Sequence, residues 1–222
     1  MVAGASSDHP LRLNVTKIKE VNESLTELLY AIRHVEDLET LRGLEGNAAL
    51  QYYSVFNELI LQQQEHFRFQ GRNRRPPLDN INALLSFTYT LLMHDVQAAL
   101  EGVGLDAYVG FLHRDRPGRS SLALDMIEEL RGVYADRFVL SLINKKIIDH
   151  RGFHRKETGA VIMDADTRKK VLSAWQERKQ EKIRHPFLNE RIAWGLVPHA
   201  QSLLLARYIR GDLDEYPPFM WK

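Results

Sequence analysis

The segment Ser120-Ser-Leu-Ala-Leu-Asp-Met-Ile-Glu-Glu-Leu-Arg131 combines a helical pattern with an unusual pair of acids. Ser120 or Ser121 is a typical N-cap for the helix that follows. Asp125 and Glu128 stand three residues apart, so on a helix their carboxylates share one face. Acids in the first turns of a helix usually lie in solvent. Here the surrounding positions are apolar, namely Leu122, Leu124, Ile127 and Leu130. Carboxylates held against an apolar core are stabilised by a bound cation. The pattern therefore predicts that this helix supplies half of the ligands of a metal site.

Two further residues are candidates for the rest of that site. His113 ends the extended segment Gly110-Phe-Leu-His and precedes a turn, so its imidazole can project into a cleft. Taken alone, a histidine in such a place is more often a core or turn residue than a ligand. Glu45 could equally be an ordinary glutamate in the first turn of a helix. The glycines beside it, however, would let another backbone or a phosphate approach closely. Two carboxylates and one imidazole suit Mn²⁺ or Mg²⁺, with zinc as an alternative.

The overall composition indicates one soluble globular core. The chain has 222 residues, 44% of them hydrophobic, and a formal net charge of +1. It contains no cysteine, which excludes disulfides and thiolate ligands. We find no apolar run near the roughly 20 residues of a membrane span and no signal-peptide core at the N-terminus. We therefore expect a cytoplasmic protein with no membrane association.

Local arginine clusters are the candidates for nucleic-acid contacts, because the net charge is nearly neutral. Loop arginines that only keep a surface soluble are equally common. The candidates lie in two segments: Arg72, Arg74, Arg75, Arg114, Arg116 and Arg119.

The apolar periodicity predicts an all-α fold made of several helices. Between Phe153 and Met163 the pattern leaves room for one short hairpin or a loop. We expect a polar lead at 1–16 and a helical catalytic domain at 17–222, ending in an aromatic, proline-containing tail that docks on the surface. The expected helices cover 18–41, about 45–60, 79–102, 120–143 with a break allowed at Gly132, about 164–175, and 186–209.

Four motifs in the same order resemble a known family. They are Leu44-Glu-Gly46, Asn82-Ala-Leu-Leu-Ser-Phe-Thr-Tyr89, Gly110-Phe-Leu-His113 and Ser121-Leu-Ala-Leu-Asp-Met-Ile-Glu-Glu-Leu-Arg131. Together they resemble the integrase and nuclease of CRISPR adaptation, closest to the type I-C branch. The likeness extends from about Lys17 to the C-terminus.

The resemblance implies that Glu45, His113 and Glu128 hold a catalytic Mn²⁺ or Mg²⁺, with Asp125 as an assisting carboxylate. It implies that the 3′ hydroxyl of a captured prespacer attacks a phosphodiester at the edge of a CRISPR repeat, and that the same site acts as a nuclease when water attacks. Asn82 and Tyr89 would support the site.

The family resemblance also implies partners. Members act on DNA as homodimers, two of which flank a central dimer of a small second adaptation subunit. They usually carry an N-terminal β-rich domain that helps to form the dimer, and we expect this chain to lack it. We expect metal binding to survive that loss, and dimerisation and full integration to be impaired.

A non-enzymatic interpretation stays open on the residues alone. The same helices could form a DNA-binding or assembly module in which the acids pair with Arg114 or Arg131. Such a buried network would need no ion.

Overall fold

The computed structural model describes residues 15–114 and 116–221. It confirms the predicted all-α fold, with two short antiparallel hairpins added. The helices are α1 (Val15–Ile32), α2 (Leu38–Ser54), α3 (Asn80–Gly102), α4 (Ser121–Leu130), α5 (Arg137–Asn144), α6 (Ala165–Gln180) and α7 (Val197–Ile209). The strands are β1 (Phe153–Arg155), β2 (Val161–Met163), β3 (Lys182–Arg184) and β4 (Arg191–Ala193). The expected polar lead lies outside the described residues as far as position 14, and Val15 and Thr16 already belong to α1.

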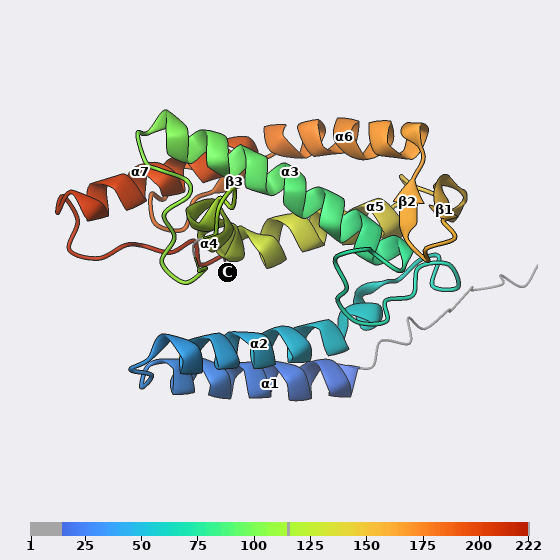
Figure 1. The fold of residues 1–222 in the computed structure, drawn as a ribbon, viewed down its shortest axis with the longest axis horizontal. Coiled ribbons are helices and arrows are strands. Elements are labelled where there is room, and N and C mark those ends of the chain that lie inside the picture. Colours follow the sequence, from blue (N-terminus) through green and yellow to red (C-terminus); the bar gives the residue numbers. More distant parts are fainter. Residues whose placement is uncertain (1–14, 115, 222) are drawn as a thin grey trace, which may run out of the picture.

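Helix α3 is the centre of the main body and packs against α4 and α7 (Figure 1). The predicted start of α3 is confirmed. The Asp79 carboxylate caps the helix there by accepting a hydrogen bond from the amide of Asn82 at 2.7 Å. Side chains on several of its faces are buried, and burying each large apolar side chain contributes roughly 1.5–3 kcal/mol. The largest of them are Ile81, Leu84, Leu85, Leu92, Val96 and Leu100.

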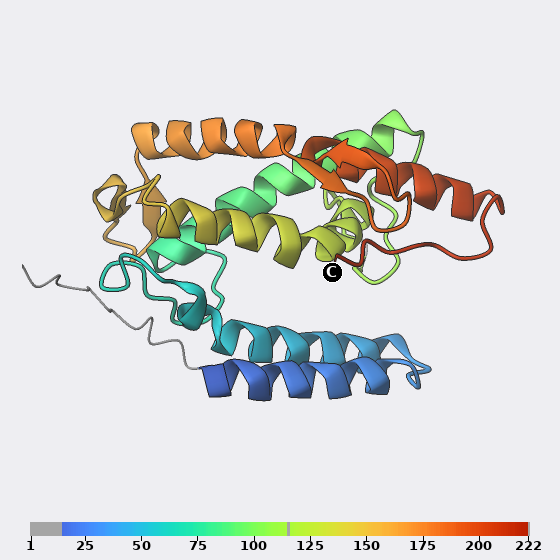
Figure 2. The same cartoon turned by 180° about the vertical axis from the view of Figure 1, so that it is seen from behind.

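Helices α1 and α2 form a hairpin that lies along one side of this body (Figures 1 and 2). None of the described side chains in either helix is buried. The predicted boundary between them was wrong: α1 ends at Ile32 rather than near position 41. Asp37 then caps α2 by accepting from the amide of Thr40 at 2.8 Å. As a result, Glu45 lies in the second turn of α2 and not at its start.

The helix that follows Ser120 begins as predicted, but Ser120 does not cap it through its side chain. Its hydroxyl instead donates to Gln97 Oε1 at 3.1 Å. The break allowed at Gly132 is a π-helical segment, Arg131–Asp136, that joins α4 to α5. Such widened turns occur often at functional sites.

The C-terminal third differs most from expectation. Between Phe153 and Met163, where the sequence allowed a hairpin or a loop, the hairpin β1–β2 forms; the last helix ends at Ile209 as predicted, but its predicted start near position 186 is wrong. Instead β3 pairs with β4, and α7 begins only at Val197. The tail docks as expected, with Trp221 stacked on Trp194 at a ring separation of 5.0 Å. No helix in the described part of the chain is both long and apolar enough to cross a membrane.

Gly152 is a position where a side chain should not be tolerated. A Cβ atom there would lie 1.8 Å from Oγ1 and 3.0 Å from Cβ of Thr167, which is buried in the first turn of α6. We expect Gly152→Ala to cost roughly 1–3 kcal/mol of stability, since overpacking forces a backbone shift. Thermal unfolding followed by circular dichroism measures this. Gly43→Ala is the matched control because space at Gly43 is open, and an equal loss in both variants would contradict the packing argument.

Candidate metal and nucleic-acid site

Asp125 holds the segment that ends in His113. Its carboxylate accepts hydrogen bonds from the amides of Phe111 at 2.5 Å, Leu112 at 3.1 Å and His113 at 2.9 Å. It also contacts Nδ1 of His113 at 2.6 Å. Burial raises the pKa of Asp125, but these hydrogen bonds outweigh burial and leave the pKa below its ordinary value. The sequence therefore folds this segment around a carboxylate on the first turns of α4.

The contact with Asp125 fixes which ring nitrogen of His113 is used. Because Nδ1 faces Asp125, Nε2 is the nitrogen left to meet a ligand. A carboxylate behind a histidine is the usual arrangement behind metal-binding imidazoles, where it fixes the tautomer and raises basicity. The assisting role expected for Asp125 thus has a physical basis in its contacts.

Gly110 allows this close packing of the segment on α4. A Cβ atom at position 110 would lie 2.7 Å from Cβ of Ser121 and 2.9 Å from Oδ2 of Asp125. We expect Gly110→Ala to displace the Asp125 carboxylate from its amide partners and to lower both stability and any activity that depends on His113. Nuclear magnetic resonance of the imidazole nitrogens would show a changed His113 tautomer, whereas an unchanged spectrum would contradict the prediction. Gly46→Ala, where space is open, is the control.

Glu128 lies one turn further along α4, and its carboxylate pairs with the guanidinium of Arg131. Burial raises the pKa of Glu128, and the charge of Glu45 raises it further, while Arg131 and His113 act in the opposite direction. The two carboxylates and the imidazole therefore interact electrostatically, although they come from α2, α4 and the segment before α4. A cation between them would relieve the repulsion between Glu45 and Glu128.

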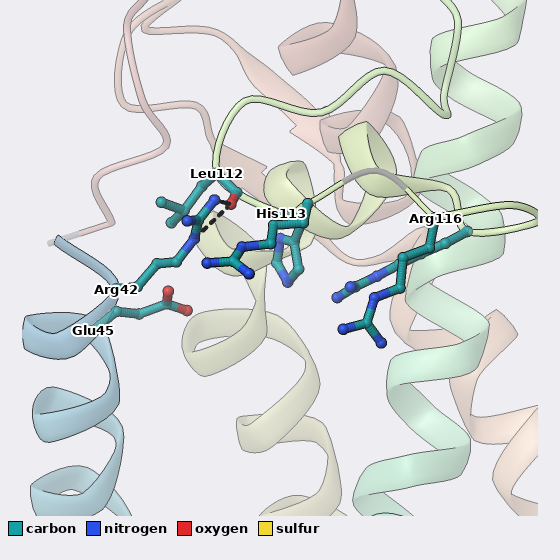
Figure 3. Close-up of a pocket in the computed structure, with 7 residues that line it drawn as sticks. Arg42, Glu45, Leu112, His113 and Arg116 are labelled. Atoms are coloured by element: carbon teal, nitrogen blue, oxygen red, sulfur yellow. Dashed lines mark hydrogen bonds between the residues drawn. The ribbon is translucent and has the colours of Figure 1, made fainter. Parts of the chain in front are cut away.

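Glu45 and His113 line a cavity of about 290 Å³ together with several arginines. Figure 3 shows the Glu45 carboxylate reaching from α2 toward the His113 ring, with Arg116 on the far side. The arginines of this cavity are Arg42, Arg114, Arg116 and Arg119. Three of these were predicted from the sequence as phosphate contacts.

A neighbouring cavity of about 660 Å³ shares Arg42 and Glu45 with the first. It contains two more of the predicted arginines, Arg72 and Arg74. Arg72 is half-buried and donates to Oδ1 of Asn82 at 2.8 Å, so it also braces the start of α3. Arg75 is exposed and lines neither cavity.

Arg42 is a site residue that the sequence interpretation missed. It donates to the carbonyl of Leu112 from Nε at 3.1 Å and from Nη2 at 2.6 Å, and it pairs with Glu39. It therefore ties α2 to the segment that carries His113. Helical spacing could have identified Arg42 as a site residue, because it precedes Glu45 by three residues and so shares its helix face.

The donor set fits a hard divalent cation in its chemistry: two carboxylates, and an imidazole whose Nε2 is left for a ligand. In the part of the chain that the structure describes, no three histidine, aspartate or glutamate side chains already stand close enough together to form a metal cluster. The Glu128 carboxylate is engaged by Arg131 in this arrangement. The predicted ligands are thus not assembled around a point: Glu45 and His113 line one cavity, whereas Glu128 lines neither of the two cavities described above.

Comparison with known proteins places the chain among proteins of CRISPR systems. The family described as "CRISPR associated protein Cas1" matches residues 4–177. A protein of Chlorobaculum tepidum named CRISPR-associated endonuclease Cas1 1 is 53% identical over 221 residues, covering 100% of this chain and 64% of that protein. A CRISPR-associated endonuclease Cas1 of Leptospira interrogans is 46% identical, covering 92% of this chain and 80% of its own length. The chain thus spans about 64% of the length of the first of these relatives.

Solved structures agree with the sequence relatives. A Cas1 protein from Thermotoga maritima superposes with a TM-score of 0.76 at 26% identity, covering 91% of this chain and 63% of that one. A casposase bound to integration product superposes with a TM-score of 0.78 at 25% identity, covering 92% of this chain and 61% of that one. The fold, the order of the motifs and the relatives agree, and the chain belongs to the Cas1 family of CRISPR-associated proteins.

Proposed function

We propose that this chain is the catalytic helical domain of a metal-dependent DNA endonuclease and integrase of CRISPR adaptation. The observation that carries the proposal is the Asp125–His113 contact beside Glu45, which presents an oriented imidazole and a carboxylate to one cavity lined by arginines. Relatives named as endonucleases at 53% and 46% identity support it.

In this proposal Glu45, His113 and Glu128 hold Mn²⁺ or Mg²⁺. The ion, when bound, would withdraw charge from a phosphodiester oxygen and lower the pKa of an attacking hydroxyl or water. Asp125 keeps the His113 ring in the required orientation. Arg131 holds the Glu128 carboxylate until an ion competes for it.

The arginines of the 290 Å³ cavity are suited to hold the DNA backbone, because guanidinium groups bind phosphates through paired hydrogen bonds. The proposed reaction is attack by the 3′ hydroxyl of a prespacer on a phosphodiester at a CRISPR repeat. Attack by water at the same site gives cleavage. The similarity to a casposase that was solved with its integration product supports this choice of reaction.

The same family membership supports a proposal about partners. A Cas6-RT-Cas1–Cas2 complex contains a chain of similar fold, with a TM-score of 0.79 at 23% identity. We propose that the protein forms a homodimer and assembles with the small second adaptation subunit on DNA.

The direct test is cleavage of branched and duplex DNA by the purified chain with Mn²⁺, with Mg²⁺ and with a chelator. We expect cleavage that depends on the ion, stops on chelation and returns when the ion is restored. Cleavage that persists in chelator would contradict the proposed chemistry.

The phosphate contacts can be tested separately from catalysis. We expect Arg116→Ala to weaken DNA binding for every sequence and to reduce the slope of log affinity against log salt by about one, since one phosphate contact is lost. Fluorescence anisotropy over a salt series measures both. Arg168→Ala, at an exposed position on α6, is the matched control. An equal effect in both variants would show that Arg116 acts only through net charge.

The non-catalytic alternative has one observation in its favour. The predicted pairing of an acid with Arg131 exists, whereas Arg114 pairs with Glu39 at 2.7 Å rather than with the acids of α4. That interpretation predicts DNA binding without cleavage under any metal condition.

A further inference from the structure

The helix that carries Glu45 is attached to the body by polar contacts near its start, and by polar and aromatic contacts near its end. None of the described side chains in α1 or α2 is fully buried, and the aromatic packing of α2 on the core is made by the half-buried Tyr52 and Tyr53 near its end. Near the start of α2, Arg42 binds the carbonyl of Leu112. Near its end, the hydroxyl of Tyr52 donates to Oδ2 of Asp136 at 2.8 Å. Glu45 lies between these two attachments.

Asp136 is the meeting point of three helical elements. It ends the π-helical segment after α4 and is 1% exposed. Its Oδ1 accepts from the hydroxyl of Tyr89 on α3 at 2.5 Å, while its Oδ2 accepts from Tyr52 on α2. Tyr53 on α2 joins the same network, because its hydroxyl lies within hydrogen-bond distance of the Tyr89 hydroxyl, at 2.9 Å.

The burial of Asp136 makes its hydrogen bonds to Tyr52 and Tyr89 important. Burial raises its pKa to about 6, and the hydrogen bonds from Tyr89 and Tyr52 act against that rise. The buried carboxyl group depends on those two hydroxyls for its hydrogen bonds. A buried carboxylate without such partners is strongly unfavourable, so the geometry of all three side chains is tightly fixed.

The Tyr89 end of this network leads to Glu128. The guanidinium of Arg131 lies over the Tyr89 ring at 5.1 Å from its centroid, and the same guanidinium pairs with Glu128. The Tyr52 end leads to Glu45, which lies seven residues earlier on α2 and so on the same helix face. One carboxylate thus connects both proposed metal ligands that lie on helices.

We infer that Asp136 is a positioning residue, which through Tyr52 and Tyr89 sets the separation between Glu45 on α2 and Glu128 on α4. The inference rests on the proposed function of those two glutamates. It predicts that loosening this network moves α2 relative to the body and weakens metal binding, without unfolding the chain.

The absence of cysteine allows the movement to be measured by spin labels. Cysteines replace Leu50 on α2 and His94 on α3, both of which are exposed. Double electron–electron resonance then reports the distance between helices without metal or DNA. Mn²⁺ affinity is measured in parallel by titration against its electron paramagnetic resonance signal. Circular dichroism verifies that each variant is folded.

Tyr52→Phe is the mild variant, because it removes only the hydroxyl that ties α2 to Asp136, and Asp136→Ala is the severe one. We expect both to shift or broaden the distance distribution, and to weaken Mn²⁺ binding by about 10-fold or more, as is common when supporting residues of a metal site are lost. The matched control is Tyr134→Phe, which removes the hydroxyl of a buried tyrosine that has no hydrogen-bond partner in the described structure.

The outcomes distinguish failure of the proposed function from failure of the positioning role of Asp136. If the unsubstituted chain binds no Mn²⁺, the proposed function fails. If it binds Mn²⁺ but Tyr52→Phe and Asp136→Ala match Tyr134→Phe in distance or in affinity, the positioning role is overturned. A change in both measurements for folded Tyr52→Phe supports it.

Discussion

Replacing His113 with alanine should lower metal-dependent DNA cleavage by at least about 100-fold. A bound ion contributes several kcal/mol of charge stabilisation in the transition state, and each 1.36 kcal/mol corresponds to a factor of ten in rate. Glu45→Ala and Glu128→Ala should have similar effects, because each removes one carboxylate from the proposed set of ligands. Cleavage of a labelled branched DNA under single-turnover conditions measures the rates.

Controls for these variants lie on neighbouring helices. His94→Ala alters an exposed histidine on α3, and Glu23→Ala alters an exposed glutamate on α1 of the same hairpin as Glu45. Both should retain the original rate. Adding Mn²⁺ should raise the melting temperature of the unsubstituted chain and of the two controls, but not of the three ligand variants. Ligand variants that cleave within twofold of the original rate would refute the assignment.

Asp125→Ala should produce the largest loss of stability among the site variants. It leaves three backbone amides and the His113 ring without their acceptor, and loss of hydrogen bonds to a part-buried charged group costs roughly 1.5–3 kcal/mol. Activity should fall as well, because nothing then orients His113. Urea denaturation measures the free energy of unfolding. Asp166→Ala, at an exposed position in the first turn of α6, is the control, and equal stability of the two variants would contradict this account.

The sequence allowed prediction of elements whose signals are local. The start of α3 follows from its Asp79 cap, and β1–β2 follows from a short apolar run beside a turn. The border between α1 and α2 was misplaced because apolar residues continue with helical spacing through the turn, at Val35 and Leu38. The β3–β4 hairpin was missed because each strand has only three residues, too few to show an alternating pattern.

In the candidate site, too, features with local sequence signals were predicted and long-range contacts were not. Residue types and spacing pointed to Glu45, His113 and Glu128, and the contacts of Asp125 fit the assisting role proposed for it. The Tyr52–Asp136 hydrogen bond joins residues 84 positions apart, and the Arg42–Leu112 bond joins residues 70 apart. No local pattern predicts such pairs, since they depend on how α2 lies against the body.

The central claim is that one divalent ion is held jointly by α2, the His113 segment and α4. Crystals grown with Mn²⁺ and measured at an X-ray energy above the manganese edge test it most directly. We expect a single anomalous peak bonded to the carboxylates of Glu45 and Glu128 and to Nε2 of His113, with the Glu128–Arg131 pair loosened. A peak bonded to other residues, or no peak while Glu128 stays paired with Arg131, would contradict it.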